Sequence, residues 1–170
     1  MKQLWPLLFL ATALFGFGGE LESFEAKFEQ HIVDENGKQV VYRGYVWAER
    51  PHSIHWRYSE PVKKEVYMNG NEVIVIEPDM EQALVRQLRE EIDLFTILSH
   101  AKEVAPHRYE AQYDSQTFTV TTEEERLSSI SYRDTFDNRI ELRFSEQHQN
   151  VPIPEETFRA EIPEEYDVIY

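Results

Sequence analysis

The stretch Ser23-Phe-Glu-Ala-Lys-Phe-Glu-Gln30 alternates apolar and polar side chains, and this period of two decides the fold class. In an extended chain, Phe24, Ala26 and Phe28 fall on one face, and the charged residues between them fall on the other. The pattern is typical of a β-strand with one buried face. Because it recurs along most of the chain, the sequence predicts a mainly β protein.

Further strands are predicted wherever the alternation resumes between turn signals. Asn36-Gly37 and Asn69-Gly70 are pairs that favour tight hairpin turns with positive backbone angles, and Gly44 marks a bend or bulge inside a strand. About ten strands are predicted, near residues 24–28, 40–48, 54–58, 66–68, 73–76, 109–113, 118–122, 127–132, 140–144 and 158–162. So many strands favour a strongly curved antiparallel sheet or an incomplete β-barrel.

One segment departs from the alternation. Between about Gln87 and Val104 the apolar residues recur at helical spacing, and Pro106 ends the run. These apolar residues are Leu94, Phe95, Leu98 and Ala101. We therefore predict a single helix that covers the open side of the curved sheet.

Residues 1–18 have the layout of a secretory signal peptide, in which a lysine precedes the apolar run Leu4–Phe17. The run is short for a membrane span. Cleavage after Gly18 is the first choice and cleavage after Ala13 the second, whereas a retained anchor helix is disfavoured by the proline and glycines in the segment. We expect an exported domain of residues 19–170.

The composition narrows the function classes. The chain has no cysteine, which excludes disulfides, thiolate metal sites, a cysteine nucleophile and a lipidated N-terminal cysteine. The net charge of -15 disfavours binding to nucleic acid or to anionic membrane surfaces. His52 and His55 would point to opposite faces of a strand, so no metal site is expected. The residues after the signal contain no nucleophile elbow, phosphate loop or dinucleotide fingerprint, and we predict neither an enzyme nor a cofactor.

Aromatic residues are abundant, with 10 Phe, 9 Tyr and 3 Trp. The concave face of the predicted sheet would carry Phe28, Val46, Ile54, Trp56 and Tyr58. These side chains either form an ordinary packed core or line an apolar cavity. In the second case the apolar helix would act as a lid that can be removed.

Several short segments carry a more specific signal: Ser23–Gln30, Gly44–Trp56, Asn69-Gly70, Glu81–Ala83, Thr157–Pro163 and Asp167-Val168. Through these segments, in this order, the sequence resembles the periplasmic lipoprotein carrier family, LolA. The resemblance implies a half-open β-barrel with a helical lid, located in the periplasm. Its cavity would hold the acyl chains of lipoproteins released by an inner-membrane ABC transporter and deliver them to an outer-membrane acceptor. It also implies no cofactor and no covalent chemistry, and we expect a monomer.

The resemblance also assigns roles to residues. Arg50 matches the arginine that bonds to lid backbone and holds the closed form, and Ile54 and Trp56 match residues that help line the cavity. Together with the residue pattern, this gives a predicted acyl cavity lined by Phe28, Val46, Ile54, Trp56, Tyr58, Leu94, Phe95 and Leu98. Arg50 is the predicted lid latch.

The sequence departs from the family at its start, since only residues 19–23 separate the predicted signal from Phe24, where family members carry a helix. Part of the lid is therefore expected to be missing or reduced. One alternative keeps the fold but makes the protein a periplasmic sensor or adaptor that binds lipid or lipoprotein. A hydrolase of acyl substrates is the enzymatic alternative, and it would need a Ser-His pair that the sequence does not place.

Overall fold

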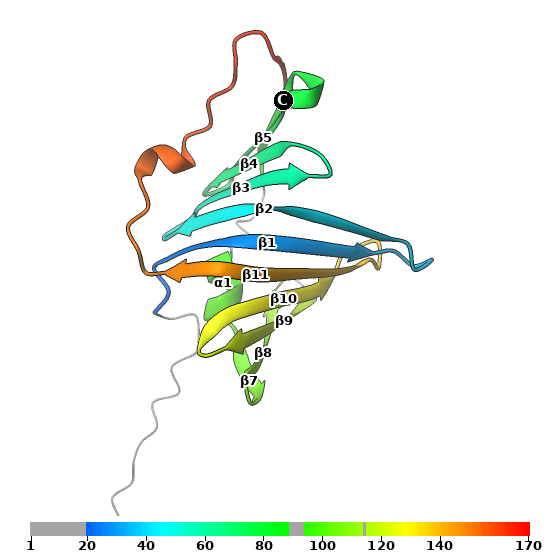
Figure 1. The fold of residues 1–170 in the computed structure, drawn as a ribbon, viewed down its shortest axis with the longest axis vertical. Helices are drawn as coiled ribbons and strands as arrows, with labels where there is room; N and C mark the ends of the chain where they lie inside the picture. Colours follow the sequence, from blue (N-terminus) through cyan, green and yellow to red (C-terminus); the bar gives the residue numbers. More distant parts are fainter. Residues whose placement is uncertain (1–19, 89–93, 114) are drawn as a thin grey trace, which may run out of the picture.

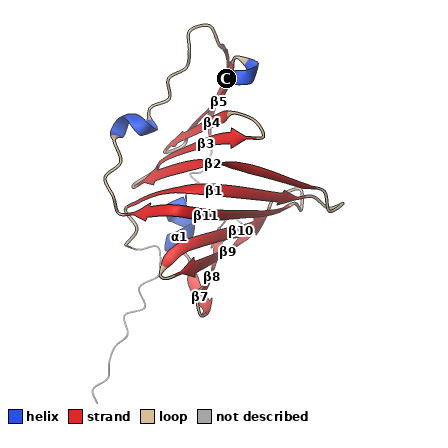
Figure 2. Ribbon diagram, viewed as in Figure 1, coloured by secondary structure: helices blue, strands red, loops and turns tan. Residues whose placement is uncertain are grey.

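The computed structural model describes residues 20–88, 94–113 and 115–170, and these contain twelve β-strands in a single sheet (Figures 1 and 2). The strands are β1 Ser23–Val33, β2 Gln39–Glu49, β3 Ser53–Glu60, β4 Lys64–Asn69, β5 Glu72–Glu77, β6 Gln82–Gln87, β7 Lys102–Ala105, β8 Arg108–Tyr113, β9 Gln116–Glu123, β10 Arg126–Arg133, β11 Arg139–Gln149 and β12 Asp167–Ile169. The helices are α1 Leu94–Ser99 and two short 3-10 helices, η1 Pro78–Met80 and η2 Glu155–Phe158.

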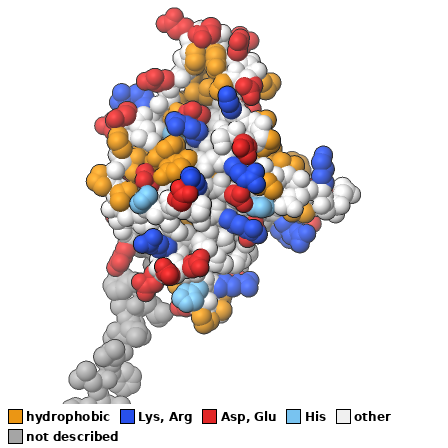
Figure 3. Space-filling model, viewed as in Figure 1, with side chains coloured by type: hydrophobic (Ala, Val, Ile, Leu, Met, Phe, Trp, Pro, Cys, Tyr) orange, Lys and Arg blue, Asp and Glu red, His pale blue; other side chains and the backbone are white. Residues whose placement is uncertain are grey.

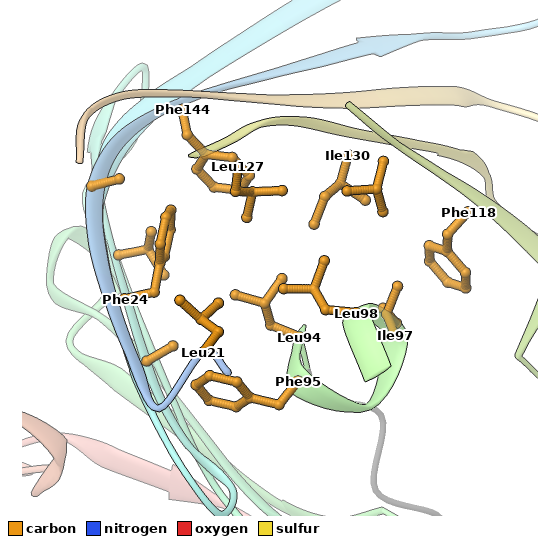
Figure 4. Packing of buried hydrophobic residues seen from close by; sticks show 14 of the residues in the cluster. Leu21, Phe24, Leu94, Phe95, Ile97, Leu98, Phe118, Leu127, Ile130 and Phe144 are labelled. Carbon is orange, nitrogen blue, oxygen red and sulfur yellow. The ribbon is translucent and has the colours of Figure 1, made fainter. Parts of the chain in front are cut away.

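The sheet is open, with the strand order β12-β6-β5-β4-β3-β2-β1-β11-β10-β9-β8-β7. All neighbours pair antiparallel except β12, which runs parallel to β6. The sheet curves around α1, whose apolar side chains point into the concave side (Figure 4). The predicted curved, mainly β architecture with a helical cover is confirmed.

The central strand β1 shows why the alternation decides the fold. Phe24, Ala26 and Phe28 are buried, whereas Lys27 between them is exposed and lies 2.8 Å from Glu146. Figure 3, seen from the same side as Figure 1, shows Lys and Arg side chains lying among Asp and Glu side chains over the middle of the molecule. Exposed pairs of this kind contribute little stability, so apolar burial on the concave side holds the sheet together.

The two predicted hairpin turns form, with a change in detail. In the first, only Gly37 has a positive φ (80°), because Asp34 builds the turn by accepting hydrogen bonds from the backbone of Asn36 and Lys38 at 2.9 and 2.8 Å. The second turn is shifted by one residue, since Asn69 still pairs with Glu72 and the loop consists of Gly70 and residue 71. The predicted positive angle at Asn36 is therefore wrong, and the side chain of Asp34 is the reason.

The predicted helix is shorter than expected. Gln87 ends strand β6, and the described helix α1 ends at Ser99, where the side chains of Ser99 and His100 both donate to the carbonyl of Thr96. Residues 102–104, which were expected to be helical, belong to β7 instead, because this strand pairs with the edge of β8. In this segment, pairing with the free edge of β8 stabilised a strand more than the helical spacing of the apolar residues stabilised a helix.

The expected strand near residues 158–162 is also wrong. Ala160 and Ile162 do pack against the sheet, on its outer face, in a cluster with Tyr67 of β4. Phe158 is buried in η2, which contacts β3 and β4. They form no strand ladder, and the side-chain amide of Asn69 donates to the carbonyl of Phe158 at 3.1 Å. Prolines on both sides of this segment remove backbone donors, which disfavours a regular ladder.

The predicted signal peptide, residues 1–18, lies outside the described residues. Among the residues that are described, no helix has the length and apolar character needed to cross a membrane.

Candidate functional site

The eight residues predicted to line a cavity lie together on the concave side of the sheet. Phe28, Val46 and Ile54 are buried there, and Trp56 and Tyr58 are half-buried against them. Helix α1 adds Leu94, Phe95 and Leu98 to the same apolar cluster. Figure 4 shows Leu94 and Leu98 pointing toward the sheet, between the side chains from β1 and those from β9 to β11.

Aromatic rings make up one wall of this concave surface. The ring of Phe28 meets those of Trp56 and Tyr58 edge to face, with centroid distances of 5.0 Å in both pairs. Nearer the start of β1, Phe24 meets Phe144 of the neighbouring strand β11 at 5.2 Å. Edge-to-face contacts of this kind add to the stabilisation that apolar burial provides.

Helix α1 fills the space that the sheet encloses. The side chain of Leu98 is 0% exposed and that of Phe95 is 1% exposed, so the described conformation is a closed one at this point. Phe28, Val46 and Ile54 are buried in the same cluster as α1, so a ligand could reach them only after this apolar packing opens. Whether these residues take up acyl chains stays a prediction.

Sequence reasoning missed a second apolar part of the concave face. The register pairs Trp56 with Val66, Val66 with Val75, and Val75 with Leu84, so the same face continues across β4, β5 and β6. These side chains are half-buried rather than buried. The alternation of each strand already contained this signal, and the pairing register was needed to assign the strands to one surface.

Arg50 follows the end of β2 and lies between the segment that leads into β1 and helix α1. Its Nε donates to the carbonyl of Leu21 at 2.7 Å, and its guanidinium carbon lies 5.0 Å from the ring centroid of Phe95. The side chain therefore contacts both that segment and the helix. The structure brings Arg50 and α1 together, and the latch itself stays a prediction.

A polar cluster lies on the opposite, outer face of the sheet. His55 is 1% exposed, its ring stacks between those of Trp47 and Tyr67, and its Nε2 donates to the carboxylate of Glu65 at 3.1 Å. This hydrogen bond, helped by Tyr67 and by the charge of Arg57, lowers the pKa of Glu65 to about 2. The cluster is separated from the concave cluster by the sheet, so it stabilises β2 to β4 without lining the candidate site.

The described residues contain no group of His, Asp and Glu side chains arranged to hold a metal ion. His52 lies in the turn before β3, and His55 is occupied by Glu65. The chemistry that the concave site offers is burial of apolar surface.

Comparison with known proteins shows which family has the same sequence pattern. A family model described as "Outer membrane lipoprotein carrier protein LolA" matches residues 19–126. The chain belongs to the LolA family. The resemblance inferred from segments such as Gly44–Trp56 is thereby confirmed, since most of those segments lie within the matched range of the LolA model.

Curated LolA relatives extend the match. An outer-membrane lipoprotein carrier protein of Campylobacter jejuni subsp. jejuni is 30% identical over 170 residues, which cover 99% of this chain and 99% of the relative. A protein of the same name from Helicobacter pylori strain J99 is 35% identical over 138 residues, covering 81% of this chain and 74% of the relative. The LolA assignment therefore rests on nearly the whole chain.

A solved structure shares the fold. The crystal structure of an uncharacterized conserved protein from Thermus thermophilus aligns with a TM-score of 0.54 and covers 88% of this chain and 91% of that chain. The two sequences are 10% identical, so this likeness supports the curved-sheet fold and nothing further.

Proposed function

We propose that this chain is a periplasmic carrier that binds the acyl chains of lipoproteins beneath α1 and takes them from the inner to the outer membrane. One observation carries the proposal. Four of the six residues of α1 (Leu94, Phe95, Ile97 and Leu98) belong to the same apolar cluster as the concave face of the sheet. Moving this short helix would uncover apolar surface on the helix itself and a continuous apolar surface on the sheet.

The empty state, in which α1 covers the sheet, and the loaded state, in which an acyl chain covers it, have comparable free energies, as a carrier requires. Burying a large apolar side chain stabilises a protein by about 1.5 to 3 kcal/mol, so uncovering the four side chains of α1 costs roughly 6 to 12 kcal/mol. Burying a sixteen-carbon acyl chain returns on the order of 12 kcal/mol, at about 0.8 kcal/mol for each CH₂ group. An acyl chain can therefore replace α1 on the sheet, and α1 can in turn displace the chain at delivery.

The cellular setting belongs to the same proposal. Residues 1–18 would be removed on export, and residues 19–170 would work in the periplasm without a cofactor and without catalysing a reaction. The donor would be the inner-membrane ABC transporter that releases lipoproteins, and the receiver an outer-membrane acceptor. The name of the curated relatives, outer-membrane lipoprotein carrier protein, supports this role.

The experiment measures release of an acylated protein from inner-membrane vesicles that contain the ABC transporter and ATP. We expect the parent chain to form a soluble complex with the acylated protein. Val75→Glu, which places a charge on the half-buried concave face, should lower the yield of complex by about tenfold, since a charge in an apolar site is strongly unfavourable.

Thr117→Glu is the matched control, because it places the same charge on the exposed side of β9. It should release as much acylated protein as the parent. The proposal would be wrong if the parent chain left the acylated protein on the vesicles.

A further inference from the structure

The concave face changes character along the strands. At the end covered by α1 it is apolar, with residues such as Ala48 and Ile54. Toward the opposite end of the strands, where β1 turns into β2 and β3 turns into β4, the face becomes polar and aromatic. We call this the hairpin end. The residues concerned are Gln30, Tyr42, Tyr58, Lys64 and Tyr132, which we call the polar collar.

The pairing register places the collar on one face. Gln30 lies opposite Tyr42, and Tyr58 lies opposite Lys64. Tyr58 belongs to the concave side because its ring packs against that of Phe28. Tyr132 also packs against the concave cluster.

Four members of the collar, Gln30, Tyr42, Tyr58 and Lys64, contact one another. The hydroxyl of Tyr58 donates to Oε1 of Gln30 at 3.2 Å, and the rings of Tyr42 and Tyr58 meet edge to face at 5.9 Å. The ammonium of Lys64 lies 4.6 Å from the ring centroid of Tyr58 and 5.9 Å from that of Tyr42. The contacts hold a cation at the edge of the apolar surface.

Lys64 is unusual among the cations of this acidic chain. It is half-buried, and within the described residues no carboxylate lies close enough to form an ion pair with it. Many of the other cations on the sheet, such as Arg43 and Arg57, are paired with glutamates. A half-buried ammonium that faces only aromatic rings keeps hydrogen-bond donors available for a ligand.

The collar is rich in donors. Burial, together with the nearby phenols of Tyr132 and Tyr42, raises the pKa of Tyr58 to about 12, so this hydroxyl stays protonated across the physiological range. The hydroxyls of Tyr42 and Tyr132, the side-chain amide of Gln30 and the ammonium of Lys64 can donate to a ligand. The hydroxyl of Tyr58 donates to Gln30 and so orients its amide, and the collar itself has no carboxylate. Such a set suits a ligand whose polar part consists of acceptor oxygens.

We propose that the polar collar binds the carbonyl or carboxylate oxygens at the head of an acyl chain while the hydrocarbon tail lies on the apolar surface toward α1. The acceptor oxygens can come from the ester and amide groups of an acylated protein or from the carboxylate of a free fatty acid. The inference rests on the proposed function and adds the orientation of the ligand, with its head at the hairpin end.

The test uses the full exported chain and displacement of an apolar fluorescent probe by two ligands, palmitate and methyl palmitate. Lys64→Met keeps most of the side-chain length but removes the charge, and Lys64→Arg keeps the charge. We expect Lys64→Met to bind palmitate about tenfold more weakly than the parent, because hydrogen bonds to charged groups are the stronger ones, and Lys64→Arg to restore most of that loss. Methyl palmitate should lose less affinity, whereas Tyr58→Phe should weaken both ligands severalfold.

Lys63→Met is the control, since Lys63 is the exposed neighbour of Lys64, and it should match the parent. Equal palmitate and methyl palmitate affinities for the parent, Lys64→Met and Tyr58→Phe would overturn the collar while leaving the proposed function standing. If neither ligand displaces the probe from the parent, the proposed function fails and the collar with it. A loss confined to palmitate assigns the collar to a carboxylate, and a loss shared by both ligands assigns it to carbonyl oxygens in general.

Discussion

Replacing Gly44 by alanine is expected to destabilise the domain by at least about 3 kcal/mol, the largest effect on stability that we predict for a single added methyl group. A Cβ at this position would lie 1.9 Å from the backbone oxygen of Arg57 and 2.9 Å from Cε1 of Phe28. Backbone cannot rotate away as a side chain can, and the register of β2 against β3 already shifts at Gly44. The measurement is the free energy of unfolding in urea.

Gly37→Ala provides the comparison. A Cβ there meets nothing within 4 Å, but φ is 80°, so the cost should be the backbone strain of about 1 to 2 kcal/mol. If Gly44→Ala unfolds at the same urea concentration as the parent, or costs no more than Gly37→Ala, the predicted steric conflict between β2 and β3 at Gly44 is contradicted.

Replacing Arg50 by leucine is expected to have the largest effect on delivery. The variant loses the hydrogen bond to the carbonyl of Leu21, in the segment before β1, and the contact with the ring of Phe95 in α1, so the side chain that joins that segment to the helix is lost. A charge-assisted hydrogen bond contributes about 1.5 to 3 kcal/mol. We expect this loss to destabilise the empty closed form more than the loaded form, so that uptake should persist, while transfer to an acceptor should fall by about tenfold or more.

Loading and delivery are measured separately, with the same acylated protein, on the parent, Arg50→Leu and Arg126→Leu. Arg126 is exposed at the start of β10 and serves as a control for loss of one positive charge. Equal delivery by Arg50→Leu and the parent would contradict the latch role and show that Arg50 acts as an ordinary surface charge.

Much of the fold could be predicted because the period of two is a local property of each strand. The alternation around Phe24 and Phe28 identified the buried face of β1 without any knowledge of its partners. The helix boundaries could not be found in the same way, since residues 102–105 became a strand only through pairing with β8. The strand predicted near residues 158–162 failed for a related reason. Arg159 and Glu161 are exposed while the apolar residues around them are buried or half-buried, as in a strand, but the segment has no strand partner.

The residues of the candidate site likewise differ in whether the sequence alone could identify them. Phe28, Ile54 and Trp56 were found from alternation and from the resemblance to LolA, whereas the polar collar depends on which residues face each other across strands. Lys64 reads as an ordinary surface lysine in the sequence, and only its register opposite Tyr58 places it on the concave face. Register is fixed by the whole sheet, so a single strand does not contain it.

Tryptophan quenching by a brominated acyl chain tests the central claim, that acyl chains enter the concave face beneath α1. In a Trp5→Phe, Trp47→Phe protein the remaining emission comes from Trp56, whose ring packs against Phe28 on that face. In a Trp5→Phe, Trp56→Phe protein it comes from Trp47, which stacks on His55 on the outer face. We predict that a brominated palmitoyl ligand quenches Trp56 and leaves Trp47 unchanged. Equal quenching of the two, or none of Trp56 while the ligand is bound, would contradict the account.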